Sequence, residues 1–293
     1  MKERVTLAHL SDLHLVADPA RPRTETRLFG RLRGMNGHFR RLLADPEVQS
    51  ADLVMVTGDV TDHGLMAEWE VFWEAVETAG LGARLLAIPG NHDVCCLDLV
   101  RRRPLSEDWA RMRCGLRLGG QEVEFPAVRR VGRELALFAI DSTNGGNCSG
   151  LDNAVGRLGR EQLSRLGRSL LLWQQVPHKL ILLHHSPNIP RPATSRRRRE
   201  RPLRLWERRG LELDPFDRRC LRLLAAIFGV KAILHGHTHD ALDRTVGGVR
   251  LVGAPASTEP DRRGALCYKL HHLYLESGLL RCRERRVPAS PGS

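Results

Sequence analysis

The chain has 293 residues, and 42% of them are hydrophobic, which is enough apolar content to build the core of one large domain. It has neither an apolar signal segment at its N-terminus nor an apolar run of the roughly 18 residues that a membrane helix needs, so composition predicts a soluble, cytoplasmic protein without a membrane partner. Its seven cysteines are odd in number and irregularly spaced, which argues against a disulfide framework and fits a reducing compartment.

The net charge of +12 is concentrated in one segment. Between Arg191 and Arg209, nine arginines against two glutamates give a local charge of +7 and leave +5 for the rest of the chain. Such a run is usually a solvated surface, and the alternative is a site for an anionic partner. We expect a single domain over residues 1–287 with an arginine-rich insertion loop at about 190–213, and a disordered tail at 288–293.

Short apolar runs alternate along the chain with stretches of helical periodicity. Eight runs have the character of buried strands: 5–10, 53–57, 84–88, 134–140, 179–183, 231–234, 249–253 and 265–275. Apolar side chains recur at helical spacing in three places: Leu65, Trp69, Phe72, Trp73 and Val76; Leu163, Leu166 and Leu170; and Leu221, Leu224, Ala225 and Phe228. The alternation predicts an α/β protein whose functional loops gather at the carboxyl ends of its strands.

Polar residues follow the first two of these strands. Ser11-Asp12-Leu13-His14 follows the first, and in extended backbone Asp12 and His14 would point the same way and chelate one cation. Gly58-Asp59-Val60-Thr61-Asp62 follows the second, and an aspartate after a tight glycine turn can bridge two metal ions with its two oxygens.

Three later strands also end in potential ligands. Gly90-Asn91-His92-Asp93 offers an amide oxygen, with a histidine beside it that could reach a substrate phosphate. His184-His185 adds an imidazole, and in Gly236-His237-Thr238-His239 the glycine would let the backbone turn tightly enough to aim both rings inward. Each fragment alone has an ordinary explanation as a cap, a turn or a core histidine. Together they have the donor inventory of a two-metal hydrolase, and mixed nitrogen and oxygen donors favour Mn²⁺ or Fe, with Zn²⁺ as a further possibility.

The five blocks resemble, in order, those of the calcineurin-like metallophosphoesterases, over roughly residues 5–252. The resemblance implies a four-layer α/β/β/α sandwich of two mixed sheets flanked by helices, with a dinuclear site along one edge. It implies that one metal ion is held by Asp12, His14 and His239, that the other is held by Asn91, His184 and His237, and that Asp59 bridges them. His92 would protonate the leaving oxygen or stabilise the phosphoryl group, and Asp62 and Asp93 would orient ligands. His185 is the rival of His184 for the fourth block.

Individual residues separate the branches of this family. Protein serine/threonine phosphatases carry Arg-Gly where this chain has His63-Gly64, and a glutamate where it has Asp93. Nucleases of the repair branch add a capping domain, for which the roughly forty residues after Gly253 are too few. The chain is most similar to the class III cyclic-nucleotide phosphodiesterases and their glycerophosphodiesterase relatives, through residues 9–14, 140–143, 150–151, 162–163 and 184–187. Ser186 is a departure, since a relative would have proline there.

The sequence therefore predicts a metal-dependent phosphoric ester hydrolase with Asp59 and His92 as catalytic residues. We expect a phosphodiesterase that acts on cyclic nucleotides or related small phosphodiesters through a hydroxide bridging two metal ions. Three alternatives stay open: a phosphomonoesterase, a nuclease or nucleic-acid-binding protein recruited between Arg196 and Arg209, and a binding or scaffold protein on this fold, against which the intact Asp59, Asn91 and His92 argue. The second is not favoured, because Trp206 is the one aromatic residue there for base stacking. A flexible arginine lid over 196–199 that attracts anionic substrates is a further hypothesis, and the oligomeric state is not indicated.

Overall fold

The strands of this computed structural model form two mixed sheets, and the structure describes residues 3–20, 32–94, 105–143, 154–188 and 209–290. The first sheet contains β1 (Arg4–Leu10), β2 (Leu53–Thr57), β3 (Leu85–Ile88), β10 (Ala265–Tyr274) and β11 (Leu280–Pro288). The second contains β4 (Ala127–Val131), β5 (Leu135–Ala139), β6 (His178–Leu182), β7 (Ala232–His235), β8 (Leu242–Val246) and β9 (Val249–Gly253). The strand orders are β11-β10-β1-β2-β3 and β4-β5-β6-β7-β9-β8.

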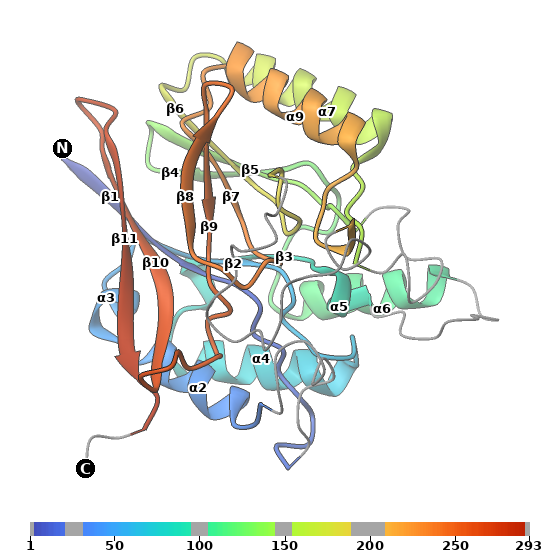
Figure 1. Ribbon diagram of the computed structural model, residues 1–293, viewed down its shortest axis with the longest axis vertical. Helices are drawn as coiled ribbons and strands as arrows, with labels where there is room; N and C mark the ends of the chain where they lie inside the picture. Colours follow the sequence, from blue (N-terminus) through green and yellow to red (C-terminus); the bar gives the residue numbers. More distant parts are fainter. Residues whose placement is uncertain (1–2, 21–31, 95–104, 144–153, 189–208, 291–293) are drawn as a thin grey trace.

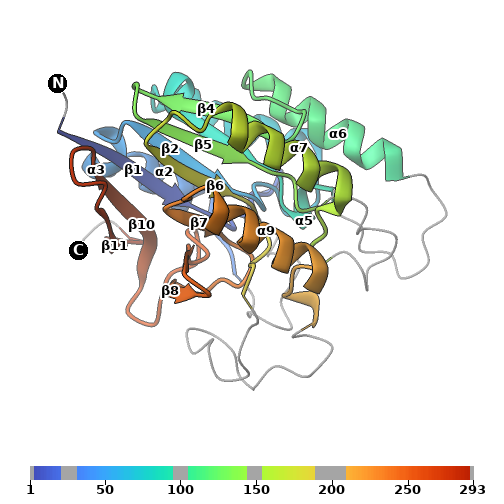
Figure 2. The ribbon, with the colours of Figure 1, turned by 90° about the horizontal axis from the view of Figure 1, so that it is seen from above.

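Helices cover the outer face of each sheet (Figures 1 and 2). The helices are α2 (Met35–Leu43), α3 (Pro46–Gln49), α4 (Met66–Thr78), α5 (Asn91–Val94), α6 (Leu105–Leu118), α7 (Gly159–Leu172) and α9 (Pro215–Ile227), with a 3₁₀ turn, η1 (Gly82–Arg84). Side chains of α2, α4 and α6 pack on the five-stranded sheet, and those of α7 and α9 pack on the six-stranded sheet. The result is the four-layer α/β/β/α sandwich that the sequence predicted.

The two-residue period of the strands divides their side chains between three apolar layers. On β1, Leu7 faces the layer between the two sheets, whereas Ala8 and Leu10 face the helices. On β6, Leu180 lies between the sheets and Ile181 lies under α7 and α9. The central strands are apolar on both faces because both faces are covered.

Short polar signals fix where the helices begin. The Asp214 side chain accepts hydrogen bonds from the backbone of Phe216 and Asp217, and Pro215 occupies the first turn, where no donor is needed, so α9 starts there. The Glu68 carboxylate accepts from the backbone N–H groups of His63 and Leu65 and thereby caps α4.

Parallel pairing brings the ligand-bearing strand ends to one edge of the sandwich. β1, β2 and β3 run parallel in the first sheet, as do β5, β6, β7 and β9 in the second. Backbone hydrogen bonds continue past the strands, from the Asp12 N–H to the Gly58 carbonyl (3.1 Å) and from the Gly236 N–H to the His184 carbonyl (3.0 Å). The loops that follow the strands are therefore held in register with each other.

All eight predicted strands are present, whereas β4, β8 and β11 were not predicted. Each of these three lies at an edge of its sheet, with charged or solvated side chains on the open side. β10 lies between β1 and β11, so it is not an edge strand. The helices α2, α3, α5 and α6 were also not predicted.

One predicted boundary needs correction, and another prediction lies mostly outside the described residues. β11 includes Pro288, and the Ala289 N–H donates to the Gly264 carbonyl (2.9 Å), so the tail predicted at 288–293 begins too early. Within the arginine-rich segment, residues 190–208 lie outside the described part of the chain, and so does the lid hypothesis for 196–199. Leu213, at the end of that segment, is fully buried and pairs with Gly156.

In the part of the chain that the structure describes, no helix is long and apolar enough to cross a membrane. The four cysteines in that part, Cys114, Cys220, Cys267 and Cys282, are free thiols.

Candidate metal centre

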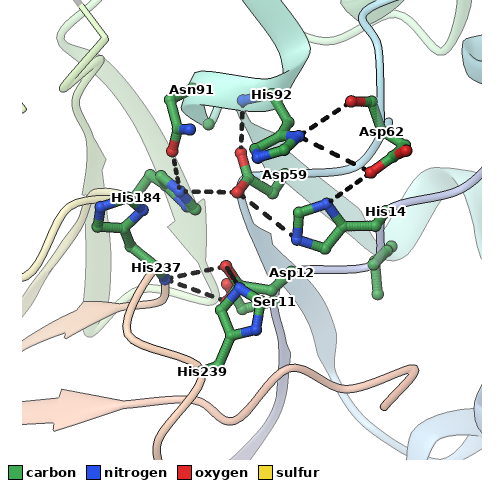
Figure 3. A network of polar contacts seen from close by, with 12 residues as sticks. Ser11, Asp12, His14, Asp59, Asp62, Asn91, His92, His184, His237 and His239 are labelled. Atoms are coloured by element: carbon green, nitrogen blue, oxygen red, sulfur yellow. Dashed lines mark hydrogen bonds and ion pairs between the residues drawn. The ribbon is translucent and has the colours of Figure 1, made fainter. Parts of the chain in front are cut away.

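The structure brings all seven predicted metal ligands together at the edge where the two sheets meet (Figure 3). Asp12 and His14 follow β1, Asp59 follows β2, Asn91 opens α5 after β3, His184 follows β6, and His237 and His239 follow β7. All seven side chains are buried. Each sheet contributes ligands, so the centre spans the junction between the two halves of the sandwich.

Five of these residues have left-handed backbone conformations. The φ angles are 53° at Asp12, 47° at His14, 50° at Asp59, 67° at His237 and 56° at His239. No other non-glycine residue among those described has a positive φ. The expectation that Asp12 and His14 converge through extended backbone was therefore wrong. Such conformations cost free energy and persist where the surrounding structure enforces them, most often at functional sites.

Two glycines permit the close approach of the ligand loops. A Cβ on Gly90 would lie 2.2 Å from the backbone nitrogen of Asp59, and one on Gly236 would lie 1.8 Å from Ser11 Oγ. The sequence suggested that Gly236 makes the tight turn. In the structure the left-handed conformations belong instead to His237 and His239, the two histidines that follow it. Gly236 is needed for the space that its missing side chain leaves beside Asp12.

One group of potential ligand atoms contains Asp12, His14 and His239, with the atoms within 4.8 Å of one another. His239 Nε2 lies 3.4 Å from Asp12 Oδ1. Both Asp12 oxygens accept the His237 N–H at 3.1 Å, which fixes the carboxylate in place.

A second group contains Asp59, His184 and His237. Asp59 Oδ2 lies 3.2 Å from His184 Nε2 and 3.8 Å from His14 Nε2, so this oxygen faces both groups. Asn91 Oδ1 lies 3.1 Å from His184 Nε2 and adds a neutral oxygen donor. Asp59 therefore lies between the two groups, and the division of the seven side chains between two ions stays a prediction.

Each ligand histidine turns its second nitrogen toward a partner outside the centre. The partners are Asp62 Oδ1 for His14 Nδ1 (3.3 Å), the Thr57 carbonyl for His184 Nδ1 (2.7 Å), the Ala154 and Gly210 carbonyls for His237 Nε2 (3.0 and 2.9 Å), and Glu259 Oε2 for His239 Nδ1 (3.3 Å). A carbonyl oxygen can only accept, so the nitrogen facing it carries the hydrogen and the inward nitrogen offers its lone pair. The donor set therefore fits two divalent metal ions.

Burial and charge set the protonation of the centre without metal. Burial raises the pKa of the Asp59 carboxyl, but the imidazoles of His184 and His92 outweigh this and hold that pKa well below its usual range. Burial opposes charge on His184, yet the Asp59 carboxylate raises the pKa of this imidazole to about 9. Burial and the neighbouring His184 lower the pKa of His237 to about 4, which keeps this ring neutral as a ligand must be.

His92 lies beside the Asp59 carboxylate and is bonded to it through its backbone. Its backbone N–H donates to Asp59 Oδ1 (2.8 Å), and its Nδ1 faces the Asp62 carbonyl (2.9 Å). Nδ1 thus carries a hydrogen, and Nε2 lies on the other side of the ring. The Asp62 carboxylate lies 3.8 Å from Nδ1.

Asp93 ties two ligand loops together. Its carboxylate accepts from the N–H and Oγ1 of Thr61 (2.8 Å each) and from the N–H of Gly90 (2.8 Å). Burial, with the nearby negative charge of Asp59, raises the pKa of Asp93 to about 7. The geometry supports the predicted orienting role, because this side chain links the loop that carries Asp59 to the one that carries Asn91.

The His185 ring packs against that of His237, with the ring centroids 4.4 Å apart, and its Nδ1 is turned toward Ser142. Its Nδ1 lies 2.8 Å from Ser142 Oγ, which in turn accepts the His185 N–H at 3.0 Å. Of the two rivals for the fourth block, His184 is the one that reaches Asp59 and Asn91.

Sequence reasoning missed Glu259, whose carboxylate contacts His239. It follows β9 by six positions and no motif block contains it, so no local signal marks it. The backbone partners of His184 and His237 were missed for a similar reason, since every residue has a carbonyl group.

The fold and the site define a hydrolase with two adjacent metal positions on an α/β/β/α sandwich. Comparison with known proteins agrees: the sequence profile of the calcineurin-like phosphoesterase family matches residues 5–241. The chain belongs to this family, and its clusters of histidine and aspartate side chains support a dinuclear metallohydrolase.

Individual relatives with named activities share between about a fifth and a third of their aligned residues with this chain. A "Probable glycerophosphodiester phosphodiesterase GpdQ" of Arcobacter nitrofigilis is 31% identical over 138 residues, 46% of this chain and 42% of that protein. A "Probable cyclic nucleotide phosphodiesterase" of Synechococcus sp. is 24% identical over 255 residues, 86% of this chain and 80% of that protein. Among solved structures, a dimetal phosphatase from Danio rerio superposes with a TM-score of 0.61 at 12% identity, covering 98% of this chain and 99% of that one, and shows the fold alone.

Proposed function

We propose that the chain hydrolyses small phosphodiesters of the cyclic-nucleotide or glycerophosphodiester type. The observation that carries the proposal is the position of Asp59 Oδ2 between the inward nitrogens of His14 and His184, with the His92 ring beside the same carboxylate. The preference for diesters is supported by the names of the two relatives that match this sequence. Phosphomonoester hydrolysis is the competing outcome.

Two bound divalent ions, for which Mn²⁺ or Fe is our first choice and Zn²⁺ the second, would supply an activated water and polarise the phosphoryl oxygens. Asp12, His14 and His239 would hold one ion, and Asn91, His184 and His237 the other, with Asp59 shared. The buried carboxylates of Asp12 and Asp59 offset positive charge that would otherwise be costly to place there. Hydrogen bonds outside the centre hold these side chains in place, so little reorganisation is needed when substrate arrives.

His92 is suited to donate a proton to the leaving oxygen. Its Nδ1 hydrogen is engaged by the Asp62 carbonyl, so a proton for the leaving oxygen would be carried on Nε2. Transfer of the Nε2 proton would leave a neutral ring still held by the same carbonyl.

The test compares bis(p-nitrophenyl) phosphate with p-nitrophenyl phosphate after reconstitution with Mn²⁺. We expect diester turnover, and we expect Asn91→Ala to reduce kcat/KM by at least about 100-fold because an ion loses a donor beside Asp59. The matched control is Asn36→Ala, which removes a buried side-chain amide in α2 whose oxygen and nitrogen both bond to the backbone of Val16.

A preference for the monoester would move the assignment to a phosphatase. Turnover unaffected by Asn91→Ala would contradict the assigned centre. If diesters are cleaved, a panel of cyclic nucleotides and glycerophosphodiesters then identifies the natural substrate class.

A cytoplasmic location and a small phosphoester partner are parts of the same proposal. The free thiols of the four described cysteines are compatible with a reducing compartment. Nucleic-acid binding between Arg196 and Arg209 stays a prediction that falls almost entirely outside the described residues.

A further inference from the structure

The segment that follows β9 is hydrogen-bonded to the loop that follows β1 and carries Asp12 and His14. The Ser257 N–H donates to the Ser11 carbonyl (2.9 Å), and Ser257 Oγ accepts the Ser11 N–H (3.1 Å). The Thr258 hydroxyl donates to the Leu13 carbonyl (2.7 Å). Both residues are fully buried or nearly so, so these bonds bind the two segments rigidly.

A third contact secures the same segment from the other side. His38 Nδ1, on α2, donates to the Thr258 carbonyl at 2.7 Å. The Glu259 N–H donates to the Ala256 carbonyl (3.2 Å), which closes a turn. Glu259 therefore extends from backbone that is fixed on both sides, and its side chain is only 8% exposed.

This carboxylate meets the outer nitrogen of a predicted metal ligand. Glu259 Oε2 lies 3.3 Å from His239 Nδ1, while His239 Nε2 faces Asp12 Oδ1 at 3.4 Å (Figure 3 shows the His239 ring against Asp12). A carboxylate that accepts from Nδ1 fixes the tautomer whose lone pair is on Nε2. It also increases the electron density of that lone pair and holds the ring plane against rotation.

The same device serves the other histidine of this ligand group, since Asp62 Oδ1 faces His14 Nδ1 at 3.3 Å. The histidines of the other group face backbone carbonyls. A side-chain carboxylate can be removed by substitution, whereas a backbone carbonyl cannot. The effect of Glu259 on His239 can therefore be tested without changing the partners of the other histidines.

We propose that Glu259 is a positioning residue of the metal centre, which fixes His239 as an Nε2 donor for the ion held with Asp12 and His14. The inference rests on the proposed two-metal function and adds a residue that none of its five sequence blocks contains. Its role is exerted through His239, without contact to substrate.

The first experiment measures Mn²⁺ binding to chelator-treated protein by isothermal titration calorimetry. Wild type should bind two ions, and Glu259→Gln should bind one of them about 10- to 100-fold more weakly, the usual effect of losing such a partner. The control is Asp243→Asn, which removes a carboxylate paired with Arg250 (2.8 Å) on β8 and β9, and should leave both Mn²⁺ affinities within twofold of wild type.

The second experiment needs no variant. Long-range ¹⁵N–¹H spectra of metal-free wild type at alkaline pH report which nitrogen of His239 carries the hydrogen. We expect Nδ1–H, and an Nε2–H tautomer would overturn the proposal even if Glu259→Gln fails to fold.

The outcomes distinguish a failure of the role of Glu259 from a failure of the proposed metal centre. Two ions bound by wild type and equally tightly by folded Glu259→Gln would overturn the role of Glu259 and leave the proposed function intact. A wild-type protein that takes up no Mn²⁺, Fe²⁺ or Zn²⁺ would overturn the metal centre and this inference with it.

Discussion

At the residue scale, the centre is built from backbone conformations that most side chains avoid. Five of the seven ligands have φ between 47° and 67°, in the left-handed region that is unfavourable for residues with a Cβ. Hydrogen bonds hold them there, as when the His14 and Leu13 N–H groups both donate to the Asp59 carbonyl (3.0 and 2.8 Å). The folded chain thus supplies the free energy of arranging the ligands before any ion binds.

Gly90→Ala tests this arrangement. The added Cβ would lie 2.2 Å from the Asp59 nitrogen and would have to displace backbone, so we expect a loss of about 2 kcal/mol or more in the free energy of unfolding, with weaker Mn²⁺ binding. Urea unfolding of the metal-free protein measures the first effect. Gly37→Ala is the control, because nothing lies within 4 Å of its Cβ inside α2 and alanine is the better helix former. Equal stability of the two variants would show that the ligand loops are not close-packed.

That Asp12, Asp59, Asn91, His184 and His237 gather at one edge could be predicted, because each stands within a few residues of the end of an apolar run. Their left-handed conformations could not, since a positive φ at an aspartate or histidine depends on contacts with loops distant in sequence. Glu259 was missed for the same reason: its partner His239 lies twenty positions away on another loop.

At the scale of elements, β1 and β10 carry a buried pair of histidines, His9 and His271. His271 Nε2 lies 3.3 Å from His9 Nδ1, and His9 Nε2 lies 2.9 Å from Thr57 Oγ1 on β2. Burial, with the nearby positive charges of Arg250 and Lys269, lowers the pKa of His271 to about 3. The fold therefore holds this histidine neutral.

This pair makes the protein sensitive to acid. The folded-state pKa of His271 is below the unfolded value of 6.5, so its stabilising effect is complete above about pH 6.5 and is lost as the pH falls toward 3. Each pH unit in that window costs about 1.4 kcal/mol. Between pH 6.5 and 5, we expect wild type to lose about 2 kcal/mol more of its unfolding free energy than His271→Gln does.

Urea unfolding at both pH values, in chelator to exclude metal effects, makes this comparison. The variant His272→Gln is the control, since His272 is the adjacent, more exposed histidine of the same strand. Parallel losses in wild type and His271→Gln would contradict the buried neutral state.

The strands that were predicted and those that were missed differ in burial. β2 and β6 are buried at every position, so their apolar runs were plain in the sequence. β11 reads LRCRERRVP and β4 reads AVRRV, and their arginines conceal the alternation of an edge strand. Edge strands carry such charges because these oppose pairing with other chains.

At the scale of the whole molecule, the metal centre joins the two sheets. Asp12, Asp59 and Asn91 come from the five-stranded sheet, and His184, His237 and His239 come from the six-stranded sheet. The sandwich architecture was predictable because the five blocks occur in order along nearly the whole domain. Most of the arginine-rich segment, by contrast, lies outside the described residues, so its predicted loop stays a prediction.

Because bound ions would connect both halves, we expect metal to stabilise the entire fold. Mn²⁺ at a hundred times its Kd should add about 2.7 kcal/mol per site to the free energy of unfolding, since binding occurs only to the folded state. Thermal unfolding with Mn²⁺ and with chelator measures this difference. Asn91→Ala should keep only part of the gain, and Mn²⁺ that leaves the unfolding temperature of wild type unchanged would contradict the bridging arrangement.

The central claim is a pair of metal positions that share Asp59. Anomalous diffraction from crystals grown with Mn²⁺ tests it most directly, because each ion is located by its own scattering. We predict two peaks, one beside Asp12, His14 and His239 and the other beside Asn91, His184 and His237, with the Asp59 carboxylate between them. A single peak, or peaks that do not contact Asp59, would contradict the account.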